Sequence, residues 1–189
     1  MENNLSKADD SPDRILVVAL GDSITFGYPY TRKESWVRIA GDRLGISFFN
    51  SGQPGDLTAD LRRRFPKDVL NYRPTHVIIM GGTNDAFVNI PEATVRNNIY
   101  QMTEMSKGVR IKPIIGIPIP LDDTISEQRL SLYREWMRDF AQGQGFQVLD
   151  FYKVMVDPET GYLKQGLHDD GVHPNLEGYQ EMAKIVEIK

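Results

Sequence analysis

Five short apolar runs interrupt the chain, and they are rich in β-branched, leucine or aromatic residues. They cover residues 15–20, 46–50, 76–80, 113–117 and 147–151. The first run, ILVVAL, contains no polar residue, which is typical of a strand buried on both faces of a parallel sheet. The pattern therefore predicts five strands.

Longer segments of mixed composition separate the runs, and their apolar spacing suits amphipathic helices. These segments cover residues 35–44, 57–71, 92–107, 126–142 and 176–188. Alternation of strand and helix predicts right-handed crossovers and a parallel sheet with helices on both faces. We expect residues 14–189 to form this single α/β domain and residues 1–13 to form a flexible tail.

Polar, glycine-containing loops follow the predicted strands. Ligands of parallel sheets bind beyond the carboxyl ends of the strands, where the connecting loops converge. Four such loops cover residues 21–27, 51–56, 81–85 and 118–123, and a fifth, residues 164–174, precedes the last predicted helix. We expect the functional site where these loops meet.

Composition narrows the function further. The 189 residues include 22 Lys and Arg against 26 Asp and Glu, a net charge of −4, so we expect no nucleic-acid partner. The absence of cysteine excludes thiolate metal sites and cysteine nucleophiles. No signal-peptide pattern and no apolar run near the roughly 18 residues of a membrane span is present. We therefore expect no stable membrane insertion and a cytoplasmic location, unless a leader was removed.

Ser23 follows the first predicted strand directly. A serine at the end of a buried strand exposes its hydroxyl on rigid backbone, which suits a nucleophile. The alternative is that Ser23 only caps the next helix, since serine is a favoured N-cap residue. The flanking glycines do not match a nucleotide-binding motif, because neither GxGxxG nor GxxxxGK[ST] is present.

A nucleophilic serine needs a base, and histidine is the usual one near neutral pH. Of the three histidines, His76 opens the third predicted strand at the opposite edge and is interpreted as structural. His173 lies in the late loop, three residues after Asp170, which could orient its ring. Solvated loop residues and a metal pair are the alternatives, although no dense set of further ligands supports a metal.

Acyl transfer also requires hydrogen-bond donors that face the developing oxyanion. Gly55, in a Pro-Gly turn, and Asn84, in GGTND, could supply a backbone N–H and a side-chain amide. Each has a simpler explanation, a positive φ for Gly55 and an Asx turn for Asn84. These separate explanations do not account for the fact that the candidate nucleophile, the two candidate oxyanion donors and the Asp-His pair are all expected at the same edge of one sheet.

Four short blocks of this sequence resemble those of the SGNH hydrolases, also called GDSL esterases/lipases. The blocks are GDSIT at residues 21–25, the glycine of QPGD at residue 55, GGTND at 81–85 and DGVHP at 170–174. Individually they are short, but they occur in order within the expected strand context. The resemblance covers residues 15–188.

This resemblance implies a flavodoxin-like three-layer α/β/α sandwich with a five-stranded parallel sheet. It also implies a Ser-His-Asp triad of Ser23, His173 and Asp170 that cleaves a carboxylic ester or thioester through an acyl-serine intermediate. The oxyanion would be bound by the backbone N–H groups of Ser23 and Gly55 and by the Asn84 side chain. No cofactor and no metal are implied, and the partner is a small acyl ester.

The second block departs from the common SGDT pattern, so Gly52 is an alternative to Gly55. The same resemblance implies that Asp22 and Asp85 orient the turns in which they lie, GDSIT and GGTND. The alternative interpretation is that both are ordinary surface carboxylates.

We expect Tyr28, Phe87 and Ile119 to wall the substrate cleft, although aromatic residues often only pack. The alternatives in function are a carbohydrate O-acetyl esterase on the same triad, a catalytically silent binding module and a metal-dependent hydrolase. The sequence does not define an oligomeric state.

Overall fold

The computed structural model describes residues 15–189, so the expected tail at residues 1–13 lies outside the described residues. Five strands form one parallel sheet in the order β2-β1-β3-β4-β5. This confirms the predicted sheet. The strand bounds are Leu16–Gly21 (β1), Ser47–Gly52 (β2), His76–Met80 (β3), Lys112–Ile117 (β4) and Gln147–Asp150 (β5).

The five predicted helices are present with shifted ends. They are α2 (Trp36–Leu44), α3 (Thr58–Asp68), α5 (Glu92–Gly108), α6 (Thr124–Gln144) and α8 (Leu176–Lys184). The predicted segment 57–71 splits because a 3-10 helix, Leu70–Tyr72, follows α3. Three further short helices were not predicted, because they are too short to show a periodic pattern. Each begins within three residues of a strand end: α1 (Ser23–Phe26), α4 (Thr83–Phe87) and α7 (Phe151–Met155).

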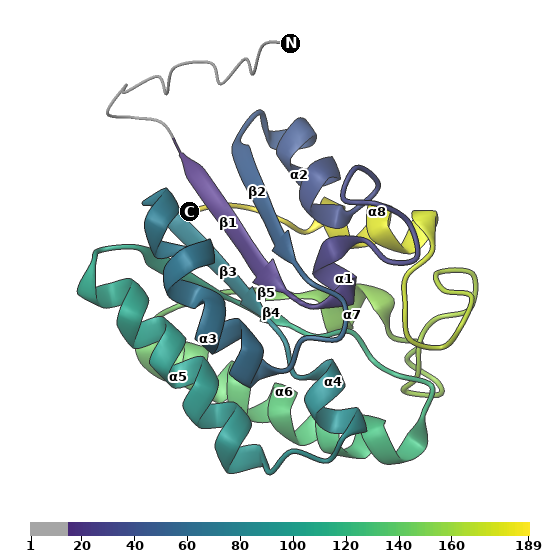
Figure 1. The fold of residues 1–189 in the computed structure, drawn as a ribbon. Coiled ribbons are helices and arrows are strands. Elements are labelled where there is room, and N and C mark those ends of the chain that lie inside the picture. The colour runs from purple at the N-terminus through teal and green to yellow at the C-terminus, as the bar shows by residue number, and fades with distance from the viewer. Residues whose placement is uncertain (1–14) are drawn as a thin grey trace.

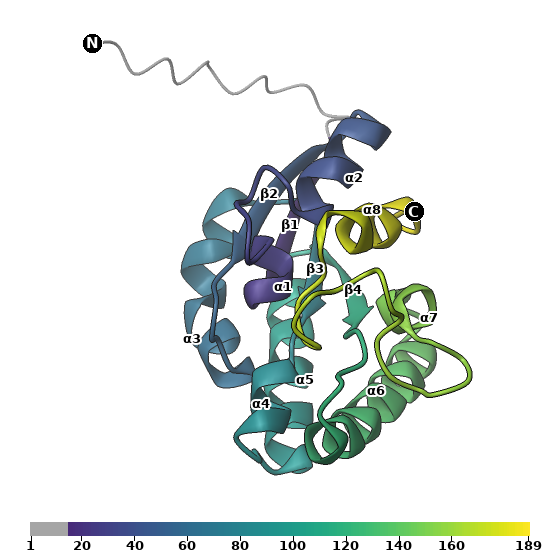
Figure 2. The same cartoon turned by 90° about the vertical axis from the view of Figure 1, so that its right-hand side faces the viewer.

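Alternate residues of each central strand enter two separate hydrophobic cores. In β1, Val17 and Ala19 face one core, while Val18 and Leu20 face the other. Helices α2, α7 and α8 cover the first core and helices α3, α5 and α6 cover the second. Figures 1 and 2 show the resulting three layers, with α8 and α3 on opposite sides of the strands. The chain therefore has the predicted α/β/α sandwich.

The register of the sheet brings the loops together at one edge. Gly21, the last residue of β1, lies opposite Gly52 of β2 and Met80 of β3. The segments that follow these three residues therefore begin at the same level of the sheet. Among residues 15–189, no helix combines the length and apolar character needed to cross a membrane.

Candidate functional site

Ser23 is the first residue of α1 and follows the end of β1 by two positions. Asp22, not Ser23, caps this helix, because its Oδ1 accepts the Ile24 N–H at 3.0 Å. The left-handed Gly27 ends the helix after one turn. The Ser23 side chain therefore does not cap the helix. Its backbone is held between the end of β1 and the short helix α1.

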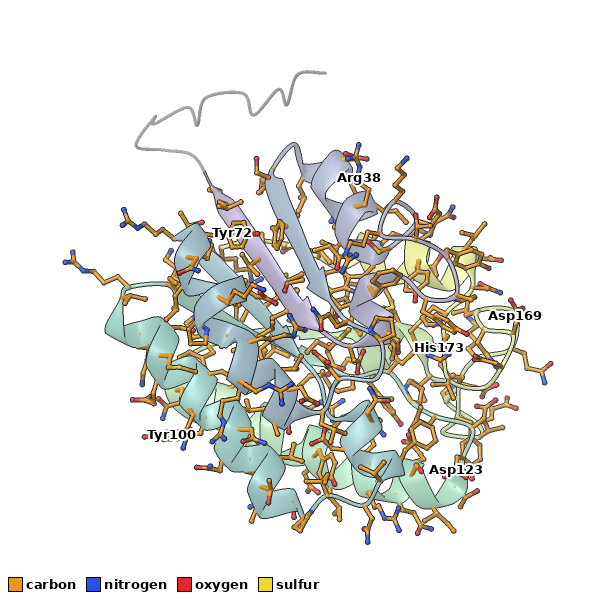
Figure 3. The ribbon with its side chains drawn as sticks, in the orientation of Figure 1. Arg38, Tyr72, Tyr100, Asp123, Asp169 and His173 are labelled. Atoms are coloured by element: carbon orange, nitrogen blue, oxygen red, sulfur yellow. The ribbon has the colours of Figure 1, made fainter. Side chains whose placement is uncertain are left out.

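A continuous chain of hydrogen bonds connects three residues of the predicted site. Ser23 Oγ lies 3.1 Å from His173 Nε2, although 150 residues separate them in sequence. His173 Nδ1 lies 2.7 Å from Asp170 Oδ2. Figure 3 shows His173 beyond the end of the sheet to which the arrows of β1 and β2 point. The topology thus brings the first loop and the last loop together.

The Asp170 carboxylate is fixed by more than the imidazole. Its Oδ1 accepts the N–H groups of Val172 and His173 at 2.9 and 2.7 Å. Partial burial acts to raise the pKa of Asp170, but the hydrogen bonds from His173 and Val172 outweigh it and lower the pKa below its ordinary value. An ionised Asp170 keeps the proton of His173 on Nδ1, which leaves Nε2 as an acceptor for the serine hydroxyl.

Gly55 lies in the loop after β2, and Asn84 lies in the first turn of α4, which is bonded to that loop. Asn84 Nδ2 donates to the Asp56 carbonyl at 2.9 Å, which ties α4 to the loop after β2. Gly55 has a φ of +85°, a conformation that glycine adopts readily.

The alternative glycine, Gly52, has a different environment. Its N–H donates to Asn50 Oδ1 at 2.9 Å. A Cβ at this position would lie 2.2 Å from the Phe26 backbone nitrogen, so close packing accounts for this glycine.

Asp22 and Asp85 are both 1% exposed, so the reading as surface carboxylates is wrong. Burial raises the pKa of Asp22 from 3.8 to about 7; the Ile24 hydrogen bond opposes this shift and the Asp85 charge adds to it. Burial also raises the pKa of Asp85, whose carboxylate accepts the backbone N–H and the hydroxyl of Thr58 at 2.9 and 2.6 Å. Asp85 therefore fastens α4 to the first turn of α3.

The three expected cleft walls have different environments. Tyr28 is 44% exposed, and its ring meets the His173 ring edge-on at a centroid distance of 4.6 Å. Phe87 is 39% exposed at the end of α4. Ile119 is 0% exposed and lies in a core cluster, so the expectation that it faces the cleft is wrong. Its carbonyl accepts a hydrogen bond from the buried Arg134, which holds this segment against α6.

The loop that carries Asp170 is held by two residues that the sequence did not single out for this role. Asp122 donates its backbone N–H to the Gly171 carbonyl at 2.9 Å, and His168 Nδ1 accepts the Gly171 N–H at 2.9 Å. His168 Nε2 in turn lies 3.6 Å from Asp122 Oδ2. The only sequence signal was the presence of His168 in the same loop, because these contacts depend on tertiary structure.

The remaining histidine lies away from this edge. His76 contacts the Thr75 hydroxyl and the Lys189 carbonyl, as expected for a structural residue. It lines a cavity of about 780 Å³ at the amino edge of the sheet. Within residues 15–189, no three His, Asp or Glu side chains are grouped as metal ligands.

Comparisons with known proteins identify the family of this chain. A profile of the GDSL-like Lipase/Acylhydrolase family matches residues 19–181. An arylesterase of Vibrio mimicus is 25% identical over 189 residues, which cover 96% of this chain and 90% of that protein. The uncharacterized lipoprotein YqeF of Bacillus subtilis is 33% identical over 133 residues, covering 64% of this chain and 55% of its own length.

The fold comparison gives the same family. The structure of a G-D-S-L family protein from Desulfitobacterium hafniense superposes with a TM-score of 0.86 at 34% identity, covering 91% of this chain and 97% of the other. The family profile covers most of the present chain, including all four blocks noted in the sequence. The chain therefore belongs to the GDSL-like lipase/acylhydrolase family.

Proposed function

We propose that this protein is a serine hydrolase that cleaves a carboxylic ester or thioester through an acyl-serine intermediate. The observation that carries the proposal is the unbroken hydrogen-bond chain from Ser23 through His173 to Asp170. The family and the arylesterase relative support the same reaction class.

In the first half of the reaction, Ser23 Oγ attacks the carbonyl carbon while His173 Nε2 takes the hydroxyl proton. Asp170 holds the ring in the required tautomer and stabilises the imidazolium that forms. His173 then donates its proton to the leaving alcohol or thiol, and the acyl group stays on Ser23. Water attacks this acyl-serine with His173 again acting as base, and the acid leaves.

The tetrahedral intermediate requires donors at its oxyanion. We assign this role to the backbone N–H groups of Ser23 and Gly55 and to Asn84 Nδ2. Among the residues described, Gly55 N–H has no hydrogen-bond partner, whereas Gly52 N–H is already bonded to Asn50. This difference supports Gly55 over Gly52. Asn84 uses one amide proton for the Asp56 carbonyl and retains a second for the oxyanion.

Tyr28 and Phe87 are the proposed contacts for the substrate. Both are exposed aromatic side chains at the edge that carries Ser23, and Tyr28 lies against the base itself. Such rings bind the apolar part of a small ester, either its acyl chain or an aryl leaving group. The cytoplasmic location and the absence of a nucleic-acid partner stay predictions from the sequence.

The test is hydrolysis of p-nitrophenyl esters from acetyl to decanoyl, with a chelator present. The wild type is compared with Ser23→Ala and with Ser131→Ala, which removes an exposed hydroxyl on α6. We expect Ser23→Ala alone to lose activity. Activity that survives in Ser23→Ala contradicts the serine mechanism, and activity lost to the chelator favours a metal-dependent one. Acetylated sugars form a second arm, which tests the O-acetyl esterase alternative.

A further inference from the structure

The side chain of Arg64, on α3, is 11% exposed, and each of its three nitrogens donates to a neighbouring oxygen. Its Nη2 donates to the Gly21 carbonyl at 2.9 Å and its Nε to Asp56 Oδ2 at 2.6 Å. Its Nη1 donates to Ser51 Oγ and to Asp68 Oδ2 at 2.7 and 2.8 Å. One guanidinium therefore joins the end of β1, the end of β2 and the loop that follows β2.

Two of these acceptors lie next to the proposed oxyanion donors. Gly21 precedes Ser23 by two residues, and Asp56 directly follows Gly55. The Asp56 carbonyl is also the acceptor for Asn84 Nδ2. The bonds of Arg64 thus reach the backbone segments that carry the Ser23 and Gly55 donors, and they reach the Asn84 donor indirectly, through Asp56.

A second contact reinforces this connection. The Gly21 carbonyl accepts the Gln53 N–H at 3.0 Å as well as Arg64 Nη2. The loop of residues 53–56 is therefore fastened to β1 directly at its start and, through Arg64, at its end. Oxyanion donors act well only when they are held in place before the reaction, and displacement by about 1 Å can cost about 100-fold in rate.

We propose that Arg64 is a positioning residue that fixes the separation of the oxyanion donors on Ser23, Gly55 and Asn84. This inference rests on the proposed serine hydrolase function. Arg64 acts through Gly21 and Asp56 and takes no part in proton transfer. Its planar fork is essential to the role, because a lysine ammonium carries one nitrogen and cannot reach acceptors on both sides of the fork.

The direct test is Arg64→Lys, which keeps the positive charge beside Asp56 and Asp68. The matched control is Arg63→Lys on the same helix, since the Arg63 side chain is 76% exposed and pairs only with Asp60 among the described residues. Active sites are counted by complete labelling with a fluorophosphonate, and kcat is expressed per labelled site. Circular dichroism and thermal unfolding report on the fold.

We expect Arg64→Lys to lower kcat per labelled site by about 10- to 100-fold with little change in KM. The shape of the pH–rate profile stays that of the wild type, because Asp170 and His173 are untouched. Arg63→Lys keeps wild-type kinetics. A purely structural role would instead lower the labelled fraction and the melting temperature and leave kcat per site unchanged, which overturns the proposal.

A double-mutant cycle with Asn84→Ala tests whether Arg64 acts through the oxyanion donors. We expect Arg64→Lys to cost clearly less in the Asn84→Ala background than in the wild type, since one donor that it positions is already missing. Equal costs in the two backgrounds overturn the proposal.

If Arg64→Lys does not fold, Asp56→Asn is tested in its place. This substitution changes the carboxylate that Arg64 binds but keeps the Asp56 backbone carbonyl, which accepts the hydrogen bond from Asn84. The proposal is supported if Asp56→Asn lowers kcat, by less than the loss of about 10- to 100-fold expected for Arg64→Lys, and if this loss is less than additive with that of Asn84→Ala. A wild-type kcat in Asp56→Asn overturns the proposal. Activity in Ser23→Ala would refute the serine mechanism as a whole. Inactive Ser23→Ala together with a fully active Arg64→Lys refutes only the role of Arg64.

Discussion

Asn84 and Asp56 are joined by a hydrogen bond of 2.9 Å from the Asn84 side-chain amide to the Asp56 backbone carbonyl. The bond fixes the orientation of the amide plane, since it identifies Nδ2 as the atom that faces the loop after β2. The second amide proton is then free to donate to a substrate oxygen.

We expect Asn84→Ala to lower kcat by about 10² to 10³-fold with little change in KM, because the lost bond forms mainly in the transition state. Steady-state kinetics on the best p-nitrophenyl ester measure this effect. Asn97→Ala, an exposed position on α5, is the control and stays at wild-type rates. A change in KM alone would assign Asn84 to ground-state binding of the substrate.

Ser23 and His173 act as one unit in the proposed mechanism. We expect Ser23→Ala and His173→Ala each to reduce kcat to a similar low level, with the double variant no worse than either. The reason is that the base has no function once the nucleophile is absent. Independent, multiplicative losses would contradict a shared proton transfer.

The buried Asp22 makes stability depend on pH. Its pKa is raised from 3.8 to about 7, so the folded state binds a proton that the unfolded state has lost between these values. Stability from this group is therefore present at low pH and falls as pH rises toward 7, by about 4 kcal/mol at most.

We expect Asp22→Asn, which retains an acceptor for the Ile24 N–H, to gain stability over the wild type as the pH is raised from 5 to 8. Urea unfolding at several pH values measures the difference. Asp42→Asn, an exposed side chain on α2, is the control. If the free energies of unfolding of Asp22→Asn and wild type change in parallel from pH 5 to 8, Asp22 is ionised over this whole range and the prediction is wrong.

Two glycines of the late loop allow a matched comparison. Gly166 and Gly171 have φ values of +85° and +79°, so alanine is strained at both. Only at Gly171 would the new Cβ also meet a neighbour, Asp122 Cβ at 2.9 Å, while at Gly166 it would meet open space.

We expect both alanine variants to lose about 1 to 2 kcal/mol of stability from the backbone alone. Gly171→Ala should lose more and should also lower kcat, because Gly171 directly follows Asp170. Thermal unfolding and kcat measure the two effects. Equal kcat in the two variants would show that the contact between Gly171 and Asp122 does not position the triad.

The sheet was predictable because each strand contains a short apolar run, and the topology of parallel strands then places Ser23 and Asn84 at one edge. The proximity of Ser23 and His173 follows from the same rule. The position of Ile119 was not predictable, because an apolar residue after a strand can face either the cleft or the core.

The role of Arg64 was equally hidden in the sequence. Its acceptor Gly21 lies 43 residues earlier, and nothing in the local pattern of α3 distinguishes Arg64 from its neighbours Arg62 and Arg63. Such side-chain networks depend on the distances between elements that only the folded chain defines. The same holds for the contacts of Asp122 and His168 with Gly171.

In the proposed mechanism, Ser23 carries the acyl group during turnover. The most direct measurement is acid quenching of the enzyme during reaction with p-nitrophenyl acetate, followed by mass spectrometry of the intact protein and its peptides. We expect one acetyl group per chain, located on Ser23 and absent from Ser23→Ala. An acetyl group on another residue that turns over with the substrate, or hydrolysis that proceeds equally well in Ser23→Ala, would contradict this mechanism.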